Sequence, residues 1–304
     1  MKKLLSSILS ITMIIVTLSA SATASSIENA RNVENLDYQT IKLRVSNIYG
    51  IPLDIVEHLD EARVRKLNAD VAPDATIFSS ESYVRFEAND QGESKAIPCT
   101  EQQYLEYLST PVLHANPGTV DVGWMKVYLI IIDDKSGNID ISSTYTWLQQ
   151  PRVIADQYDV ITMWWENGSY LEGEGFYSYQ LNGKYIDEDI LDSDLVLDYK
   201  TFKSINYAHK MNDSGARKNE FFHIKITLDK NTGLGIERAS TIYAHQEAKV
   251  NWKQALGDNL TAQTIAASFC LEGTAISFIT ALYAVFGNIE RYYIQTDLMV
   301  SQQY

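Results

Sequence analysis

The second half of the chain alternates hydrophobic and polar residues or gathers apolar residues in short runs, which is the pattern of β-strands. Residues 120–133 and 139–148 flank a short polar stretch, and this arrangement predicts a hairpin. The apolar residues 127–132 are uninterrupted, which predicts a strand covered on both faces. We therefore expect a body built mainly of antiparallel strands.

Two further hairpins are predicted farther along the chain. Residues 177–181 and 184–186 meet across an Asn-Gly step, which favours a tight hairpin turn. Residues 220–228 and 236–246 flank a loop rich in Asp, Asn and Gly, and we interpret them as a third hairpin.

Residues 145–165 contain three of the five tryptophans and are interpreted as two strands joined at a corner. Pro151 interrupts the ladder there because proline has no N–H to donate. Trp147 and one of the adjacent Trp164 and Trp165 are expected to be buried, since neighbouring residues of a strand face opposite sides. The charged residues of the corner are expected to form an ion pair across it, between Arg152 and either Asp156 or Asp159.

Helical spacing is confined to the first third of the chain. In residues 48–69 the apolar positions predict one amphipathic helix that begins near Pro52, and Asp60 marks a possible break in it. Residues 100–108 predict a short helix, because Thr100 can cap its first turn.

The apolar stretch 262–287 has a single charge, Glu272, and three interpretations are open for it: a buried helix, two core strands or a membrane-seeking segment. Gly273 divides the stretch, and its content of Thr, Ile, Phe and Tyr favours two strands. Residues 289–300 predict a closing strand.

The fold class that these patterns predict is α+β: predominantly antiparallel β, with a sandwich-like sheet body and short N-terminal helices. We expect the helical part to pack with the body as one domain. The predicted division of the chain is a signal peptide (1–24), a flexible leader (25–40), a small helical or mixed region (41–110) and a β-rich body (111–304).

The beginning of the chain has the pattern of a secretory signal peptide. Lys2 and Lys3 precede an apolar run at 8–18, and small residues follow with an A-x-A step that ends at Ala24. We expect cleavage after Ala24, with Ala22 as the alternative, and a secreted, extracellular protein. The apolar run is short for a membrane anchor, which needs about 20 residues.

The chain is acidic, with a formal net charge of −14, and loss of the predicted signal peptide would change this to −16 because that segment contains two lysines and no acid. A surface of this charge repels phosphate backbones, so nucleic acid is excluded as the expected partner. Membrane contact is not expected either.

Several elements of the chain occur together in one group of proteins. Trp147 begins a W-L-x-x-P-R step, the tripeptide Tyr158-Asp159-Val160 follows, and a Y-A-H-Q element runs from Tyr243 to Gln246. In these elements the chain resembles a group of uncharacterised exported proteins of Gram-positive bacteria, over roughly residues 50–246. The resemblance implies export and a β-rich body, and it implies no activity.

The motifs of the common hydrolases are absent from the sequence. It has no G-x-S-x-G elbow, no H-E-x-x-H zinc motif and no ligand-like spacing among its five histidines. Glycoside hydrolysis needs two carboxylates beside aromatic residues, and Glu166, Glu172 and Glu174 supply that residue type near two tryptophans. The alternative interpretation is that these acids are a solvated strand end and loop.

The aromatic side chains near these acids are the candidate binding surface. Trp164, Trp165 and Tyr170 would form it, because an exposed aromatic side chain offers a large contact area.

Calcium is the candidate metal. Asp187, Asp189, Asp192 and Asp194 place hard oxygen ligands in a predicted acidic loop, although their spacing is not that of an EF-hand. Turn formation explains aspartates in a loop equally well. No other cofactor is expected.

The chain has two cysteines, Cys99 and Cys270, and export would permit a disulfide between them. The alternative is two buried thiols.

The sequence favours a non-enzymatic extracellular binding or interaction module at the cell envelope, with an envelope polymer or protein as its partner. The first alternative is a secreted hydrolase of a cell-wall or environmental polymer that uses the carboxylates near Trp165. The second is a membrane-active exported factor that uses residues 262–287.

Overall fold

The computed structural model describes residues 23–24, 36–89, 94–109, 119–135, 137–149, 158–198, 203–211, 217–230, 238–246, 261–268 and 293–301. All strand pairs among these residues are antiparallel and they form two sheets. The prediction of a predominantly antiparallel β protein with short N-terminal helices is therefore confirmed.

The large sheet has the strand order β1-β2-β4-β5-β11-β7-β8, and β3 pairs with β2. Its strands are β1 (Thr23–Ala24), β2 (Thr76–Asn89), β3 (Ser94–Cys99), β4 (Thr119–Asp133), β5 (Asn138–Gln149), β7 (Ser169–Leu181), β8 (Lys184–Ile190) and β11 (Arg217–Asp229). The two residues of β1 belong to the stretch that the sequence assigns to the signal peptide; residues 1–22 lie outside the described residues.

The small sheet has the order β13-β12-β6-β10-β9. Its strands are β6 (Tyr158–Trp165), β9 (Val196–Asp198), β10 (Lys203–Lys210), β12 (Arg238–Gln246) and β13 (Tyr293–Ser301). The predicted closing strand is thus present as β13.

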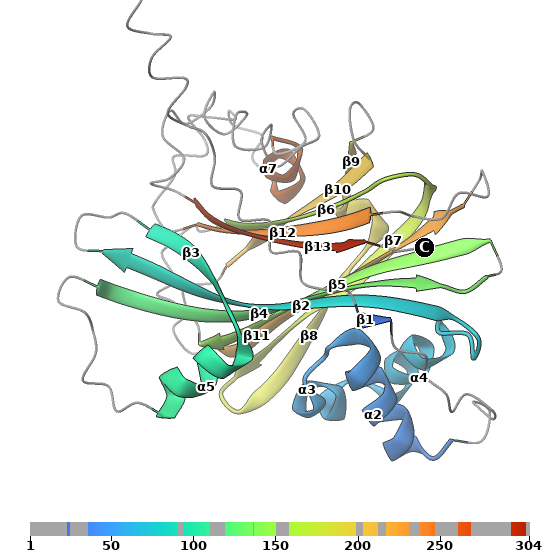
Figure 1. Cartoon of the computed structure of the whole chain (residues 1–304), viewed down its shortest axis with the longest axis horizontal. Coiled ribbons are helices and arrows are strands. Elements are labelled where there is room, and N and C mark those ends of the chain that lie inside the picture. The colour runs from blue at the N-terminus through green and yellow to red at the C-terminus, as the bar shows by residue number, and fades with distance from the viewer. Residues whose placement is uncertain are drawn as a thin grey trace, which may run out of the picture.

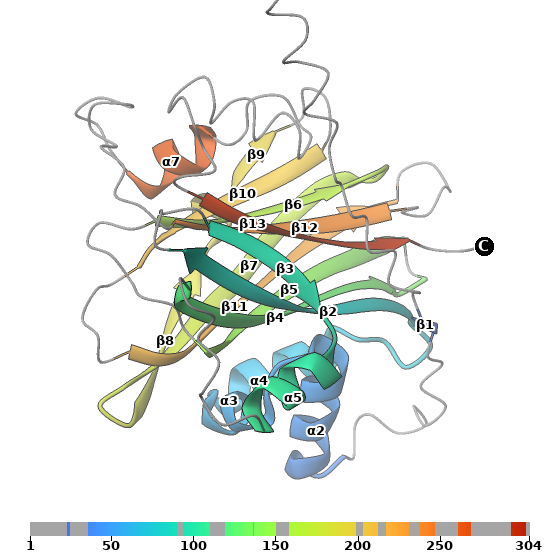
Figure 2. The same ribbon diagram turned by 60° about the vertical axis from the view of Figure 1, so that its left-hand side comes forward.

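The large sheet is covered on both faces (Figure 1). Strand β11 shows why, because its side chains alternate between two cores. Phe222 and Ile224 pack in a cluster that also contains side chains of the small sheet, such as Met163. On the opposite face, Phe221 packs with the N-terminal helices. Figures 1 and 2 show these helices on one side of the large sheet and the small sheet on the other.

The helical layer consists of α2 (Tyr38–Tyr49), α3 (Leu53–His58) and α4 (Glu61–Ala69). The break near Asp60 is confirmed: the Asp60 side chain accepts a hydrogen bond from the backbone N–H of Arg63 and so caps α4. The prediction of a leader over 25–40 was wrong for its last residues, because α2 begins at Tyr38. Asp37 caps α2, and its buried positions have helical spacing.

The short helix α5 (Glu101–Ser109) confirms the prediction for residues 100–108. Thr100 and Gln103 form a reciprocal cap, in which each side chain accepts a hydrogen bond from the other residue's backbone N–H.

The hairpins β4–β5 and β7–β8 are present as predicted. Asn182 and Gly183 both have positive φ, at 52° and 79°, as a tight hairpin turn requires. The third predicted hairpin was wrong. β11 lies between β5 and β7 in the large sheet, while β12 lies between β6 and β13 in the small one. Both edges of β11 are already paired, so the chain passes from one sheet to the other between them.

The predicted acidic loop was also wrong. Residues from Asp187 to Ile190 belong to β8, and a 3-10 turn, η2 (Asp192–Asp194), follows. The strand forms because its polar residues face solvent on an edge of the sheet, where charged side chains are common.

The preference for strands over 262–287 was wrong at its start, where Ala262–Ser268 is the helix α7. Three alanines favour a helix, and Thr261 and Thr264 cap its first turn reciprocally. Residues 269–292 lie outside the described residues. None of the helices in the described part of the chain has the length and apolar character that crossing a membrane requires.

Gly50 joins the helical layer to the sheet, and we expect Gly50→Ala to destabilise the protein. Its φ is 65°, and a Cβ there would lie 2.5 Å from Cγ of Tyr128. Left-handed strain and overpacking together should lower the free energy of unfolding by about 2–4 kcal/mol, measured by urea denaturation. Gly183→Ala is the control, since its φ is also positive but no atom lies within 4 Å. Equal losses in the two variants would contradict the role of the Tyr128 contact.

Candidate functional site

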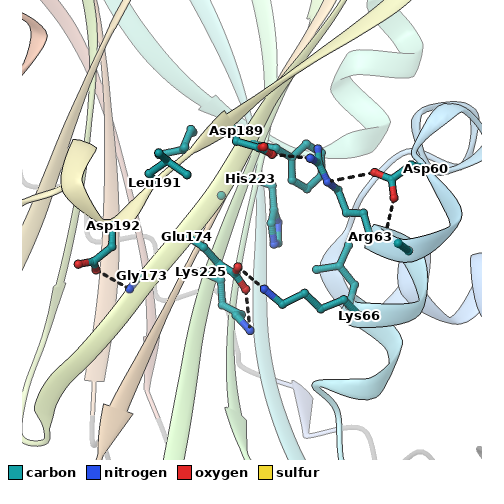
Figure 3. Close-up of a pocket in the computed structure, with 15 residues that line it drawn as sticks. Asp60, Arg63, Lys66, Gly173, Glu174, Asp189, Leu191, Asp192, His223 and Lys225 are labelled. Carbon is teal, nitrogen blue, oxygen red and sulfur yellow. Dashed lines mark hydrogen bonds and ion pairs between the residues drawn. The ribbon is translucent and has the colours of Figure 1, made fainter.

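A cavity of about 550 Å³ lies between helix α4 and strands β7, β8 and β11. Figure 3 shows Arg63 and Lys66 reaching into it from the helix, while Glu174 and Lys225 come from the sheet. Leu67 and Phe176 are apolar side chains in the lining, and the side chain of His223 lies at the back. The cavity therefore combines charges of both signs with apolar surface.

The alternation of the strands places these side chains together. Glu174 and Phe176 lie two residues apart on β7, and His223 and Lys225 lie two residues apart on β11, so all four point to the helical side. Arg63 is three residues before Lys66 on α4, which puts both on one helix face.

Lys225 is the buried cation of the site, with a side chain only 9% exposed. Its Nζ lies 2.5 Å from Asp70, 3.3 Å from Glu174 and 3.9 Å from Asp140. Burial lowers the pKa of Lys225, but the three carboxylates outweigh it, so the pKa lies above its ordinary value. Burial also raises the pKa of Asp140, and Lys225 opposes that shift only in part. The amino group thus ties the end of α4 to the sheet as a cation.

Two ion pairs cross the cavity from the helix to the sheet. Arg63 Nη2 lies 2.5 Å from Asp189, and the guanidinium carbon lies 4.8 Å from the centre of the Phe176 ring. Lys66 pairs with Glu174. Burial raises the pKa of Glu174, but the hydrogen bond from Lys66 and the charge of Lys225 outweigh it, and the pKa lies below its usual value. Glu174 is therefore a carboxylate at neutral pH.

His223 is a neutral, oriented side chain at the base of the site. Thr144 donates to the carbonyl of Tyr49 (2.8 Å) and can accept from Nδ1 of His223 (3.1 Å). Burial, assisted by the charge of Lys225, lowers the pKa of His223 to about 3. Oγ of Ser142 lies 3.5 and 3.4 Å from the two ring nitrogens, which is longer than the separation of about 2.6–3.2 Å between an activated nucleophile and its base.

The neutral state of His223 predicts acid sensitivity. The His223 ring takes up a proton below about pH 6.5 in the unfolded chain but only near pH 3 in the folded chain. The free energy of unfolding therefore keeps its full value above pH 6.5 and decreases below it. The loss should be about 1.4 kcal/mol per pH unit in that window. His223→Gln keeps a donor for Thr144. This variant should lack the decrease in unfolding free energy with falling pH that His223 causes, as measured by urea unfolding from pH 7 to 4.5. The exposed His58→Gln is the control, and an unchanged slope in His223→Gln would contradict the prediction.

Loss of the Lys225 charge should be costly, because Asp70 and Asp140 would be left without their buried cation. We expect Lys225→Met to lower the free energy of unfolding by about 3 kcal/mol. Lys126→Met is the matched control: Lys126 pairs with Glu81 nearer the surface, and such pairs contribute about 0–1 kcal/mol. A loss for Lys225→Met no larger than that of the control would show that the buried network is not stabilising.

The structure brings two of the three predicted catalytic acids together and places the third elsewhere. Glu172 and Glu174 line a small cavity of about 120 Å³ beside the larger one, together with Lys66 and Lys225. Glu166 lies elsewhere, 3.9 Å from Arg238. The acid with two cationic partners, Glu174, is the one that lines the main cavity.

The predicted aromatic binding surface is only partly exposed. Trp165 is 1% exposed and packs in the core between the sheets, so it cannot contact a ligand from solvent. Trp164 and Tyr170 are half-buried, and the Tyr170 ring stacks on Trp165 with 6.3 Å between the ring centres.

The four predicted calcium ligands have separate contacts. Asp189 pairs with Arg63, Asp192 accepts from Tyr170 and from the backbone N–H of Gly173, and Asp194 accepts from the N–H of Leu191. Asp187 is exposed on β8. In the described part of the chain, no group of three or more His, Cys, Asp or Glu side chains is arranged to hold a metal ion.

Only one of the two cysteines lies among the described residues. Cys99 ends β3, where its thiol donates to the carbonyl of Ile97 (3.4 Å), and Cys270 lies outside the described residues. The disulfide stays a prediction.

The sequence elements that carry the resemblance meet between the sheets. Asp159, buried on β6, accepts hydrogen bonds from Tyr243 (2.6 Å) and His245 Nδ1 (3.0 Å), and Trp147 of the large sheet donates to the Tyr243 hydroxyl (3.3 Å). Trp147 and one of the two adjacent tryptophans are buried, as predicted. The partners expected for the corner, Arg152 and Asp156, lie outside the described residues.

Sequence reasoning did not find Arg63, Lys66, His223 or Lys225. A signal was present in β11, where His223 and Lys225 alternate with the apolar residues Phe222, Ile224 and Ile226. Polar residues at that spacing indicate one face turned toward polar partners. Nothing in the sequence indicated that α4 lies opposite them.

No protein-family model matches this chain, and no curated protein matches it. A solved structure described as "AvmM Catalyzes Macrocyclization in Alchivemycin A Biosynthesis" shares 12% identity, with 55% of this chain and 82% of that chain covered. The TM-score is 0.24, and a likeness this weak carries no argument about function.

Proposed function

We propose that this chain is an exported, non-enzymatic binding module that acts at the cell envelope, and that the cavity beside α4 is its ligand site. The observation that carries the proposal is the cavity itself: about 550 Å³, within the range of about 300–1,000 Å³ for small-ligand sites, with a few charged groups around apolar side chains. Export rests on the signal-peptide pattern at the start of the sequence.

The protonation states favour binding over acid–base catalysis. A general acid or base works best with a pKa near the working pH. The pKa of Glu174 is held below its usual value and that of His223 falls to about 3. Both groups keep one charge state across the neutral range, which suits a recognition site.

The hydrolase alternative would use Glu172 and Glu174, which lie two residues apart on β7 and share a small cavity. A glycosidase needs one of its two carboxyls protonated, and the two lysines beside Glu174 oppose this role for Glu174, which would leave it to Glu172. The sandwich-like packing of the two sheets is a further part of our proposal, supported by the core cluster to which both contribute.

Retention of the purified protein on envelope material tests the proposal. We expect retention on cell-wall fractions, and we expect Ala62→Trp to abolish it, because Ala62 is exposed on α4 and lines the cavity, where an indole would occupy the ligand space. Arg65→Trp, exposed on the same helix and outside the lining, is the control. Liposomes are included to detect the membrane-active alternative, and soluble wall glycans to detect hydrolysis. Retention that Ala62→Trp leaves unchanged would overturn the assignment of the cavity.

A further inference from the structure

We propose that the ligand of the cavity is a free α-amino acid with an apolar side chain, and that it inserts between Lys66 and Glu174. The inference rests on the proposed function, because the amino acid would occupy the same cavity that holds the protein on envelope material and would compete with that material for it. In the bound state the ligand carboxylate would take Lys66 as its partner, and the ligand ammonium would take Glu174.

The Lys66–Glu174 pair is the one in the cavity that can be exchanged at little cost. Lys66 is 57% exposed and Glu174 is 43% exposed, and ion pairs of this kind contribute little to stability because water competes with them. Lys66 also has a flexible four-carbon stem that can move away from the sheet. Separating the pair therefore opens a gap with a cation on one side and a carboxylate on the other.

The other charges around the cavity are held in place. Arg63 pairs with both Asp60 and Asp189 and lies over the Phe176 ring. Lys225 is buried among its carboxylates, and it remains 3.3 Å from Glu174 when Lys66 leaves. Glu174 thus stays anchored by Lys225 and can accept a hydrogen bond from an incoming ammonium.

An α-amino acid matches this gap because its ammonium and carboxylate are attached to the same carbon atom. A ligand with only an ammonium would leave Lys66 without a partner, and one with only a carboxylate would leave Glu174 with Lys225 alone. The side chain of the bound amino acid would then face Leu67 and Phe176, with the neutral ring of His223 behind them. An apolar side chain suits this part of the lining best, since a charged one would lose its hydration while the nearby charges of Arg63 and Asp189 are already paired with each other.

Calorimetric titration of the purified protein with leucine tests the proposal. We expect leucine to bind, and N-acetyl-leucine and leucinamide, which each lack one charge, to bind at least about tenfold more weakly, a difference of about 1.4 kcal/mol. Lysine and aspartate should bind more weakly than leucine. Equal affinity for leucine and its two blocked derivatives would overturn the proposal.

Variants locate the binding. Lys66→Met and Glu174→Gln should each weaken leucine binding at least about tenfold, whereas Lys66→Arg, which keeps the cation, should retain most of it. Arg65→Met is the matched control, because Arg65 pairs with Glu61 on an exposed part of α4 and lines neither cavity. Urea unfolding of each variant shows that the fold is intact. Leucine binding that neither variant weakens would place the ligand elsewhere and overturn the proposal.

Failure of this inference can be distinguished from failure of the proposed function. If leucine does not bind but Ala62→Trp still abolishes retention on cell-wall material, the amino-acid ligand is wrong and the cavity remains the binding site. If leucine does not bind and retention is insensitive to Ala62→Trp, both are wrong.

Discussion

The two-residue period of β11 is the constraint on which the rest of the structure depends. One set of its side chains, including Ile224 and Ile226, completes the core between the two sheets. The other set, which includes Phe221, His223 and Lys225, faces the helical layer. A shift of the strand by one residue would exchange the two sets and bury Lys225 among aliphatic side chains, where its charge would have no partner. The register of this strand therefore fixes both cores and the candidate site together.

The helical layer is held to the sheet by polar as well as apolar contacts. Asp70 at the end of α4 meets Lys225, and the carbonyl of Tyr49 at the end of α2 accepts from Thr144. Buried polar groups are tolerated only when their hydrogen bonds are satisfied, so these contacts select one position for the helices among those that an apolar surface alone would allow. The cavity exists because α4 is fixed near β7 by long charged side chains, which leave space between them.

Much of the β architecture could be predicted from local patterns. Asn182-Gly183 determines its own turn, and the capping residues Thr100 and Asp60 determine where helices begin. The two partner strands of β11 could not be predicted in the same way, because β5 and β7 are both far from it in the sequence. The same limit applied to the site. Lys66 and Glu174 are 108 positions apart, and only the long-range packing brings them together.

The motif residues and the candidate site lie on different faces of the large sheet. Trp147, Asp159, Tyr243 and His245 are hydrogen-bonded in the core between the sheets, whereas the cavity lies under α4. A carboxylate this deeply buried is stable only with its donors in place, so Asp159 restricts which residues can stand at positions 243 and 245. That restriction applies to residues that pack between the two sheets. It places no condition on the residues that line the cavity under α4.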